Sequence, residues 1–147
     1  MAKVYISDVI NLPVDKVWAL ARDFNGHHDW HPRIAESHIE DGKPSDQVGC
    51  VRNFKLSDGG HLRETLLTLS DRDRTMTYDI IVSPMPIKNY IASFRCTPIT
   101  EGDRTFVEWE AEFNVAPEDE AEIKHAVGRE TFAVGIRALA AKLGAPE

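Results

Sequence analysis

Hydrophobic and polar positions in the last third of the chain, residues 117–143, follow the spacing of one long amphipathic helix. Apolar or small residues recur at steps of three and four, which places them on a single helical face: Ile123, Val127, Thr131, Val134 and Ala138. Pro117 suits the first turn, and Gly144 with Pro146 marks the end. A lone helix of this length is marginal in water, so we expect its apolar face to pack against another element.

Most of the remaining chain alternates apolar and polar residues, which is the pattern of β-strands with one buried face. The alternating ranges, each bounded by turn-forming residues, are 4–12, 34–39, 48–56, 61–69, 74–82, 87–97 and 105–115. The sequence Ser57-Asp58-Gly59-Gly60 is a strong hairpin signal between two of them. Short connections predict that successive strands are antiparallel neighbours.

Two short helical segments are expected between the first and second strands. Residues 13–24 start with a proline, carry apolar residues on one side and end at Asn25-Gly26. Residues 27–32 form a short helix or tight turn, because Pro32 disfavours a helical conformation at His31. The element order predicts one α+β domain over residues 1–147, with about seven strands curved around the terminal helix.

Composition narrows the functional classes. The chain has 147 residues, 42% of them hydrophobic, and a formal net charge of -7, which argues against binding to a nucleic-acid backbone. Cys50 and Cys96 lie far apart and form no CxxC pair, so we expect reduced thiols. The first residues contain no apolar signal core and no run is long enough to cross a bilayer, so we expect a cytoplasmic protein without membrane insertion.

Local stretches throughout the chain carry a family resemblance. They are residues 13–18 (PVDKVW), Trp30 with Pro32, residues 48–52 (VGCVR), residues 62–66 (LRETL), Thr77-Tyr78 and residues 107–109 (VEW). Together with the element order, they resemble the START-like, birch-pollen-allergen superfamily, also called SRPBCC or polyketide cyclase/dehydrase proteins. The resemblance implies a helix-grip fold, in which a sheet wraps around the C-terminal helix and leaves a cavity for a hydrophobic ligand.

Within that superfamily the chain also shows local likeness to the plant abscisic-acid receptors. Residues 55–61 and 84–90 correspond to the receptors' two ligand-covering loops, although the first lacks their Gly-Leu-Pro lid sequence. The receptor lysine that grips the hormone's carboxylate corresponds most nearly to His31. We therefore take the fold from this comparison and not the hormone.

Arg52 and Glu64 form the sharpest polar feature. Strand alternation places each on an otherwise apolar face, and a turn that pairs Phe54 with Glu64 would put Arg52 diagonal to Glu64. One interpretation is an internal ion pair that fixes the hairpin. The other is a polar anchor for one oxygenated group of a ligand. The resemblance favours the anchor, because members place a glutamate near Glu64 towards the ligand.

The other candidate residues follow from alternation or from the resemblance. Tyr78 and Tyr90 each offer an apolar ring with one hydroxyl. Trp109 alternates with apolar neighbours and should face inward, whereas the receptors' cavity glutamate lies nearest Glu110, so the sequence leaves open which of these two faces the cavity. The full predicted ligand-binding set is His31, Arg52, Phe54, Glu64, Tyr78, Ile80, Tyr90, Phe94, Trp109, Val127, Thr131 and Gly135.

Glycine and histidine positions allow further alternatives. Gly128 and Gly135 each cost about 1 kcal/mol in helix propensity, so they either leave room for a ligand or let the helix pack closely on the sheet. His27 and His31 stand four residues apart, but no further ligand lies nearby, so we predict no metal and no cofactor. We expect His31 to lie at a cavity entrance or in a surface turn.

No nucleophile motif, phosphate loop or GxSxG elbow is present. We therefore predict a protein that binds or transports a small hydrophobic, partly oxygenated ligand, such as a lipid, polyketide, aromatic or terpenoid. The alternative is a polyketide cyclase/dehydratase-type enzyme that acts by acid/base catalysis within the cavity, through His31, Glu64, Tyr78 or Tyr90. A partner-binding module with an incidental cavity is the third hypothesis.

Overall fold

A computed structural model describes all 147 residues and shows seven antiparallel strands in the order β1-β7-β6-β5-β4-β3-β2. The strands are β1 (Ala2–Ile10), β2 (Ile34–Ile39), β3 (Val51–Leu56), β4 (His61–Ser70), β5 (Thr75–Asp79), β6 (Ile87–Ile99) and β7 (Arg104–Val115). Between β1 and β2 lie α1 (Val14–Ala21) and the 3₁₀ turn η1 (His27–Asp29), and a second 3₁₀ turn, η2 (Glu40–Gly42), follows β2. The predicted α+β helix-grip architecture is confirmed.

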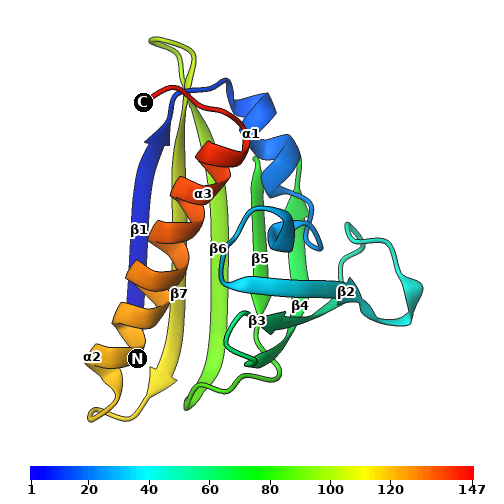
Figure 1. Cartoon of the computed structure of the whole chain (residues 1–147), viewed down its shortest axis with the longest axis vertical. Helices are drawn as coiled ribbons and strands as arrows, with labels where there is room; N and C mark the ends of the chain where they lie inside the picture. The colour runs from blue at the N-terminus through cyan, green and yellow to red at the C-terminus, as the bar shows by residue number, and fades with distance from the viewer.

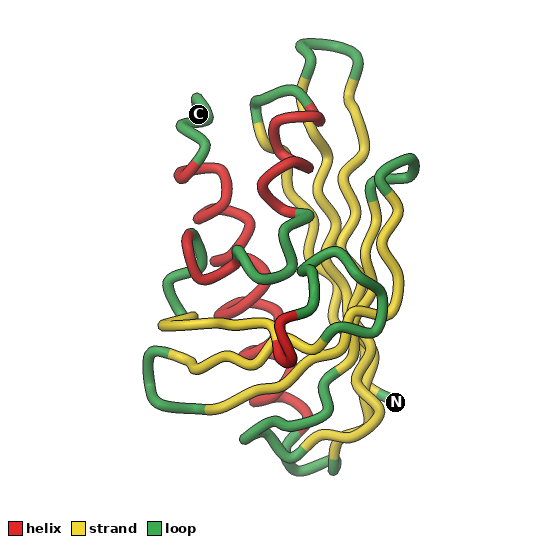
Figure 2. The backbone as a smooth tube through the Cα atoms, turned by 90° about the vertical axis from the view of Figure 1, so that its right-hand side faces the viewer, coloured by secondary structure: helices red, strands yellow, loops and turns green.

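The sheet bends around the terminal helix. Figure 1 shows β1, β7 and β6 running along the long axis of the molecule, whereas β2 runs across it. Seen from the side, the helices lie on one face of the sheet, and the strands near β2 reach across that face (Figure 2). This curvature creates a concave inner surface that faces the helix.

Alternation along β7 decides which face is inner. Trp109 is buried together with its apolar neighbours two residues away, while Glu108, Glu110 and Glu112 lie on the opposite face. On that outer face Glu110 accepts a hydrogen bond from Ser93 Oγ at 3.4 Å. Trp109 therefore faces the helix and Glu110 does not, which settles the question that the sequence left open.

The terminal helix begins later than predicted and is not regular. It comprises α2 (Glu120–His125), the π-helical segment η3 (Ala126–Ala133) and α3 (Val134–Lys142) in one continuous rod. Turns bonded from Ala116 and Pro117 occupy the residues before Glu120, so the helix does not start at Pro117. Within η3, Thr131 Oγ1 donates to the Ala126 carbonyl at 2.9 Å, a side-chain bond that accompanies the widened turn.

Both glycines of the helix serve close packing. A Cβ added at Gly128 would lie 2.9 Å from Val4 Cγ1, and one added at Gly135 would lie 2.8 Å from ring atoms of both His31 and Trp109. Ring atoms in a packed core have little freedom to move away. The close-packing interpretation therefore holds at both glycines, and Gly135 is in contact with neighbouring side chains.

Two strands are shorter than predicted for local reasons. β3 begins at Val51 and not at residue 48, because Gly49 adopts a φ of +95° and Cys50 N–H closes a turn onto Gln47. β5 ends at Asp79 and not at residue 82, because the Asp79 carboxylate takes the Thr65 N–H that a regular ladder would use. None of the helices is both long and apolar enough to cross a membrane.

Candidate functional site

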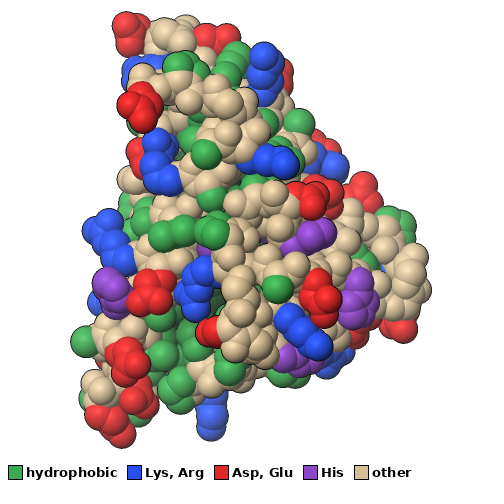
Figure 3. All heavy atoms as spheres, viewed as in Figure 1, with side chains coloured by type: hydrophobic (Ala, Val, Ile, Leu, Met, Phe, Trp, Pro, Cys, Tyr) green, Lys and Arg blue, Asp and Glu red, His purple; other side chains and the backbone are tan.

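A cavity of about 310 Å³ lies between the terminal helix and the inner face of the sheet. Its wall consists mostly of apolar side chains from β3 to β7, the β5–β6 loop and the helix. Figure 3 shows the corresponding face of the molecule hollowed near its lower centre, with hydrophobic side chains around the hollow and a basic side chain at its edge. A volume of this size lies at the lower end of the range for small-molecule sites.

Ten of the twelve residues predicted from the sequence line this cavity. They are His31, Arg52, Phe54, Glu64, Tyr78, Ile80, Tyr90, Trp109, Val127 and Thr131. Phe94 and Gly135 do not. The Trp109 ring shields Phe94, with ring centroids 5.1 Å apart, and Gly135 packs against Trp109 and His31 as described above.

Other wall residues were absent from the prediction. They are His27, Arg33, Ile34, Leu56, Asp58, Leu62, Pro84, Met85, Pro86, Ile123, Ala126 and Phe132. Leu56 and Leu62 share strand faces with Arg52 and Glu64, and residues 84–86 belong to a loop that the family resemblance marked as ligand-covering, so signals for these existed. His27 and Arg33 lie in irregular segments, where no periodicity indicates direction.

The two covering loops meet at the cavity. The β3–β4 turn contributes Asp58 and the β5–β6 loop contributes residues 84–86. A Cβ added at Gly60 would lie 3.4 Å from Pro84 Cγ, so the β5–β6 loop approaches the β3–β4 turn closely. The cavity is therefore bordered on this side by turn segments and not by a regular element.

The β3–β4 hairpin places Arg52 directly opposite Glu64. Phe54 pairs with Leu62, so the register differs by two residues from the one that the sequence suggested, and the predicted diagonal relation is wrong. The reason lies in the turn. Leu56 N–H bonds to Gly60 O, and Gly59 adopts a φ of +93°, which leaves a three-residue loop closed by a glycine in the left-handed region.

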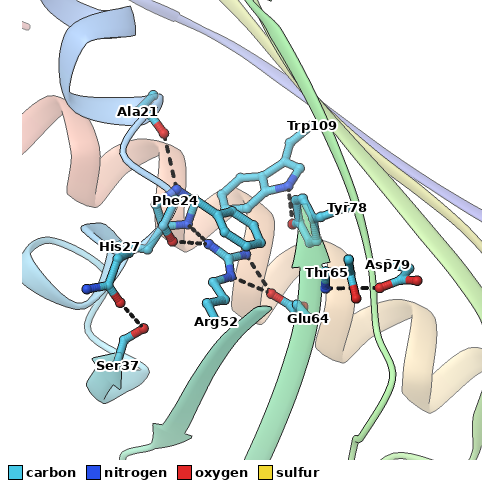
Figure 4. A network of polar contacts seen from close by, with 11 residues as sticks. Ala21, Phe24, His27, Ser37, Arg52, Glu64, Thr65, Tyr78, Asp79 and Trp109 are labelled. Carbon is cyan, nitrogen blue, oxygen red and sulfur yellow. Dashed lines mark hydrogen bonds and ion pairs between the residues drawn. The ribbon is translucent and has the colours of Figure 1, made fainter. Parts of the chain in front are cut away.

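Arg52 is the centre of a buried polar cluster (Figure 4). Its side chain is 5% exposed, and its Nε and Nη2 groups donate to Glu64 Oε1 at 2.8 and 2.6 Å. The Nη1 group donates to the Phe24 carbonyl at 2.9 Å and to His27 Nδ1 at 3.0 Å. These bonds connect the hairpin to the segment between α1 and β2.

Aromatic rings surround the same guanidinium. Its central carbon lies 4.0 Å from the ring centroid of Phe24, 4.8 Å from that of Tyr78 and 5.4 Å from that of Phe54. Such rings stabilise a cation through their electron-rich faces while they exclude water. A charged group is thus held among aromatic side chains at the cavity wall.

His27 is held as a neutral imidazole. Its Nδ1 accepts from Arg52, so its Nε2–H donates to the Ala21 carbonyl at 3.2 Å. Burial, followed by the positive charge of Arg52, lowers the pKa of His27 well below its ordinary value. His27 therefore adds no charge to the cavity wall.

Glu64 keeps free hydrogen-bonding capacity towards the cavity, and Tyr90 lies beside it in the cavity wall. Burial raises the pKa of the Glu64 carboxyl, and the adjacent Arg52 guanidinium opposes that change. The protein supplies no hydrogen-bond partner to Glu64 Oε2, yet this atom is not sealed in the interior, where Trp30 Nε1 alone is unpartnered. The Tyr90 hydroxyl lies within hydrogen-bonding reach of the Tyr78 hydroxyl. Glu64 Oε2 therefore borders the open space, and the Tyr90 side chain forms part of the cavity wall.

The tyrosines at this end are hydrogen-bond donors and not bases. Tyr78 Oη accepts a hydrogen bond from Trp109 Nε1 at 2.9 Å, which leaves its own proton available. Burial is the largest cause that raises the pKa of Tyr78 and the pKa of Tyr90 above their ordinary values. Both hydroxyls consequently remain protonated at neutral pH.

His31 is buried and bonded, in contrast to the expected entrance or surface turn. It is 2% exposed, its Nε2–H donates to the Thr131 carbonyl at 2.8 Å, and its Nδ1 accepts from Arg33 N–H at 3.2 Å. Burial lowers the pKa of His31. His31 and His27 are therefore both occupied by protein partners, and no cluster of three metal-ligating side chains is present.

The two neutral histidines predict a loss of stability in mild acid. An unfolded histidine takes up a proton near pH 6.5, whereas these folded ones resist it, so protons favour the unfolded chain. We expect the free energy of unfolding to fall between pH 7.5 and 5.5, by up to about 1.4 kcal/mol per pH unit for each histidine.

Urea denaturation of His27→Gln between pH 7.5 and 5.5 isolates the contribution of His27 to the pH dependence of stability, because glutamine does not titrate. The slope of the unfolding free energy against pH should lose the contribution of His27, which is about half of what the two histidines contribute together. His38→Gln, at an exposed position, is the matched control and should keep the full slope. An unchanged slope in His27→Gln would contradict the neutral, buried assignment.

Comparison with known proteins confirms the family resemblance. No curated protein matches the sequence. Among solved structures, protein XoxI from Bacillus cereus is 28% identical, with 97% of this chain and 96% of that chain covered at a TM-score of 0.86. A Thermobifida fusca protein solved by NMR is 31% identical, with 98% and 94% covered at a TM-score of 0.87.

A more distant structure shares the fold. The Zhui aromatase/cyclase from Streptomyces sp. R1128 is 15% identical, with 97% of this chain and 93% of that chain covered at a TM-score of 0.80. The sequence profile of the family described as polyketide cyclase / dehydrase and lipid transport matches residues 1–144. Because this match spans nearly the whole sequence, the chain belongs to the polyketide cyclase/dehydrase and lipid transport family.

Proposed function

We propose that the protein binds a small hydrophobic, partly oxygenated molecule in the cavity under its terminal helix. The observation that carries this proposal is the division of the cavity wall. An apolar majority is combined with a compact polar end, built from Arg52, Glu64, His27, Tyr78 and Tyr90. Ligand sites typically combine a hydrophobic lining with a few fixed polar groups.

The apolar part of the wall supplies the binding free energy. Phe54, Leu62, Ile80, Val127 and Phe132 face a space that their own side chains do not fill. Removing apolar ligand surface from water contributes roughly 25 cal/mol per Å². A molecule with one or two rings or a short alkyl body suits a cavity of about 310 Å³.

The polar end sets the orientation of the ligand. The Arg52–Glu64 pair is neutral as a unit, and His27 is uncharged, so this end carries no net charge. What it offers is an acceptor at Glu64 Oε2 and a hydroxyl at Tyr90. A neutral hydroxyl group of the ligand can use both, which favours an oxygenated compound over a pure hydrocarbon.

Filling the cavity from the helix tests this proposal. Ala126 lines the cavity, so Ala126→Phe should occupy ligand space, whereas Ala121→Phe places the same group at an exposed position of α2. We expect wild type and Ala121→Phe to bind the neutral fluorophore N-phenyl-1-naphthylamine saturably. Ala126→Phe should bind it at least about tenfold more weakly, because steric exclusion removes more than about 1.4 kcal/mol.

Fluorescence titration measures these affinities, and circular dichroism verifies that each variant is folded. Equal affinity in the two phenylalanine variants would show that the probe binds elsewhere. Failure of the wild-type protein to bind the probe at all would remove the support for a ligand cavity.

The alternative function is cyclase- or dehydratase-type catalysis, and one observation favours it. Glu64 is a buried carboxyl with a raised pKa and a free oxygen at the cavity surface, which are the properties of a general acid or base. Tyr90, with its protonated hydroxyl, could donate a proton to a developing oxyanion. The pairing of Glu64 with Arg52 works against this role, because it holds the carboxylate charge.

Glu64→Gln separates binding from catalysis. The substitution keeps the shape and one hydrogen-bond acceptor but cannot exchange a proton. If the protein is an enzyme, this variant should retain affinity for aromatic β-keto thioesters while cyclised or dehydrated products, followed by liquid chromatography and mass spectrometry, fall by about 10²–10⁴-fold. Product formation that persists in Glu64→Gln would exclude Glu64 as the catalytic group.

A further inference from the structure

Arg33 is a cation of the cavity wall that forms no ion pair. It is half-buried and lies between η1 and β2, beside the π-helical segment η3. Its Nη1 group donates to Thr131 Oγ1 at 2.7 Å and to the Ala126 carbonyl at 3.5 Å, and both of these partners are neutral. The other arginine of the wall, Arg52, is fully engaged by Glu64, Phe24 and His27.

The free side of the Arg33 guanidinium has the geometry that binds an oxyanion. Only Nη1 has partners in the protein, so Nε and Nη2 keep their N–H groups available. The Nε/Nη2 edge is a planar fork that matches the two oxygens of a carboxylate. The bonds from Nη1 to the helix hold this fork in place before a ligand arrives, which reduces the entropy cost of binding.

The charges around Arg33 leave this position positive. The negative charge of Glu64 is neutralised by its ion pair with Arg52. Asp58, the other carboxylate of the wall, is exposed. Asp58 Oδ1 accepts the Gly60 N–H within its own turn and forms no ion pair with Arg33. An exposed charge of this kind is screened by solvent and salt, so it compensates a half-buried guanidinium poorly.

We propose that the cavity takes an amphipathic organic acid, whose carboxylate pairs with Arg33 and whose apolar body extends towards the polar end at Glu64. This inference rests on the proposed ligand-binding function and narrows it to a chemical class. It distinguishes two polar positions in one cavity: a neutral one that recognises a hydroxyl group and a cationic one that recognises an anion.

A purely structural role for Arg33 makes a different prediction. If Arg33 only ties β2 to the helix through Thr131, its loss should weaken every ligand to a similar extent. If it recognises an anion, its loss should act on charged ligands alone. The informative quantity is therefore the ratio of the affinities for an acid and for its neutral ester, and not either affinity alone.

The probes are 2-naphthoic acid and methyl 2-naphthoate, which share one ring system and differ in charge, titrated by calorimetry at pH 7.5. Wild type should prefer the acid by about tenfold to a hundredfold, as expected for a charge-assisted, two-bond contact. Arg33→Gln should abolish this preference, and Arg33→Lys, which keeps the charge but not the fork, should retain part of it. Arg129→Gln, at an exposed position of η3, is the matched control and should keep the full preference.

Three outcomes would overturn the inference. Equal binding of acid and ester by wild type would leave the cavity function intact but remove the anion site. An equal loss of both probes in Arg33→Gln would assign Arg33 a structural role. Failure of the wild-type protein to bind either probe would contradict the proposed ligand-binding function itself. The proposal that the ligand is an organic acid would then be rejected as well.

Discussion

The buried contact between Arg52 and Glu64 is the interaction on which the cavity depends. A charged pair taken out of water costs several kcal/mol per ion unless nearly every donor and acceptor finds a partner. Here the guanidinium satisfies that requirement through Glu64, the Phe24 carbonyl and His27, within a shell of aromatic rings. Because these partners come from separate segments, the pair joins the β3–β4 hairpin to the chain between α1 and β2.

The same contact explains why the cavity has an organised polar end. Without the Arg52–Glu64 pair, apolar side chains of the hairpin could fill the cavity. The pair instead fixes polar atoms at the cavity wall. It also neutralises its own charge, so the end can accept a hydroxyl group without a counter-ion. One carboxylate oxygen remains available, and whether it orients a ligand or moves a proton is the difference between the two proposed functions.

The π-helical segment η3 shapes the opposite wall. In a π-helix, residues five apart lie on nearly the same face, which brings Ala126 with Thr131, and Val127 with Phe132, onto the cavity side. A regular α-helix would turn one member of each couple away. The widened turn is associated with the polar contacts of Thr131, through its hydroxyl to Ala126 and Arg33 and through its carbonyl to His31.

Much of the architecture could be predicted from the sequence, because strand alternation and helical periodicity report directly on burial. The inward direction of Tyr78 and Tyr90 agrees with alternation. For Trp109 alternation predicts the inward direction but the likeness to the receptors points to Glu110, so the sequence leaves that position open. The exact strand register cannot be predicted in this way, because it depends on how the single turn at Gly59 closes. For that reason the predicted register of the β3–β4 hairpin differs by two residues from the observed pairing of Arg52 with Glu64.

Residues in irregular segments were missed or misplaced for a different reason. His27 and Arg33 lie where the chain has no repeating geometry, so no pattern reveals which way they point. For His31 the sequence favours an entrance or a surface turn over a metal ligand, yet the side chain is buried and bonds to the Thr131 carbonyl. The π-helical turn was likewise not predicted, because residues 126–133 fit a regular helical periodicity and the contacts of Thr131 with His31 and Arg33 are tertiary.

A double-mutant cycle on the central pair, with unfolding free energies from urea denaturation, tests this account most directly. We expect Arg52→Met to cost about 3–5 kcal/mol, because it leaves the Glu64 carboxyl buried without its partner. The double variant Arg52→Met/Glu64→Leu should be more stable than Arg52→Met alone, since no uncompensated charge remains. Additive losses from the two substitutions, with no coupling between them, would contradict the claim that this pair organises the cavity wall.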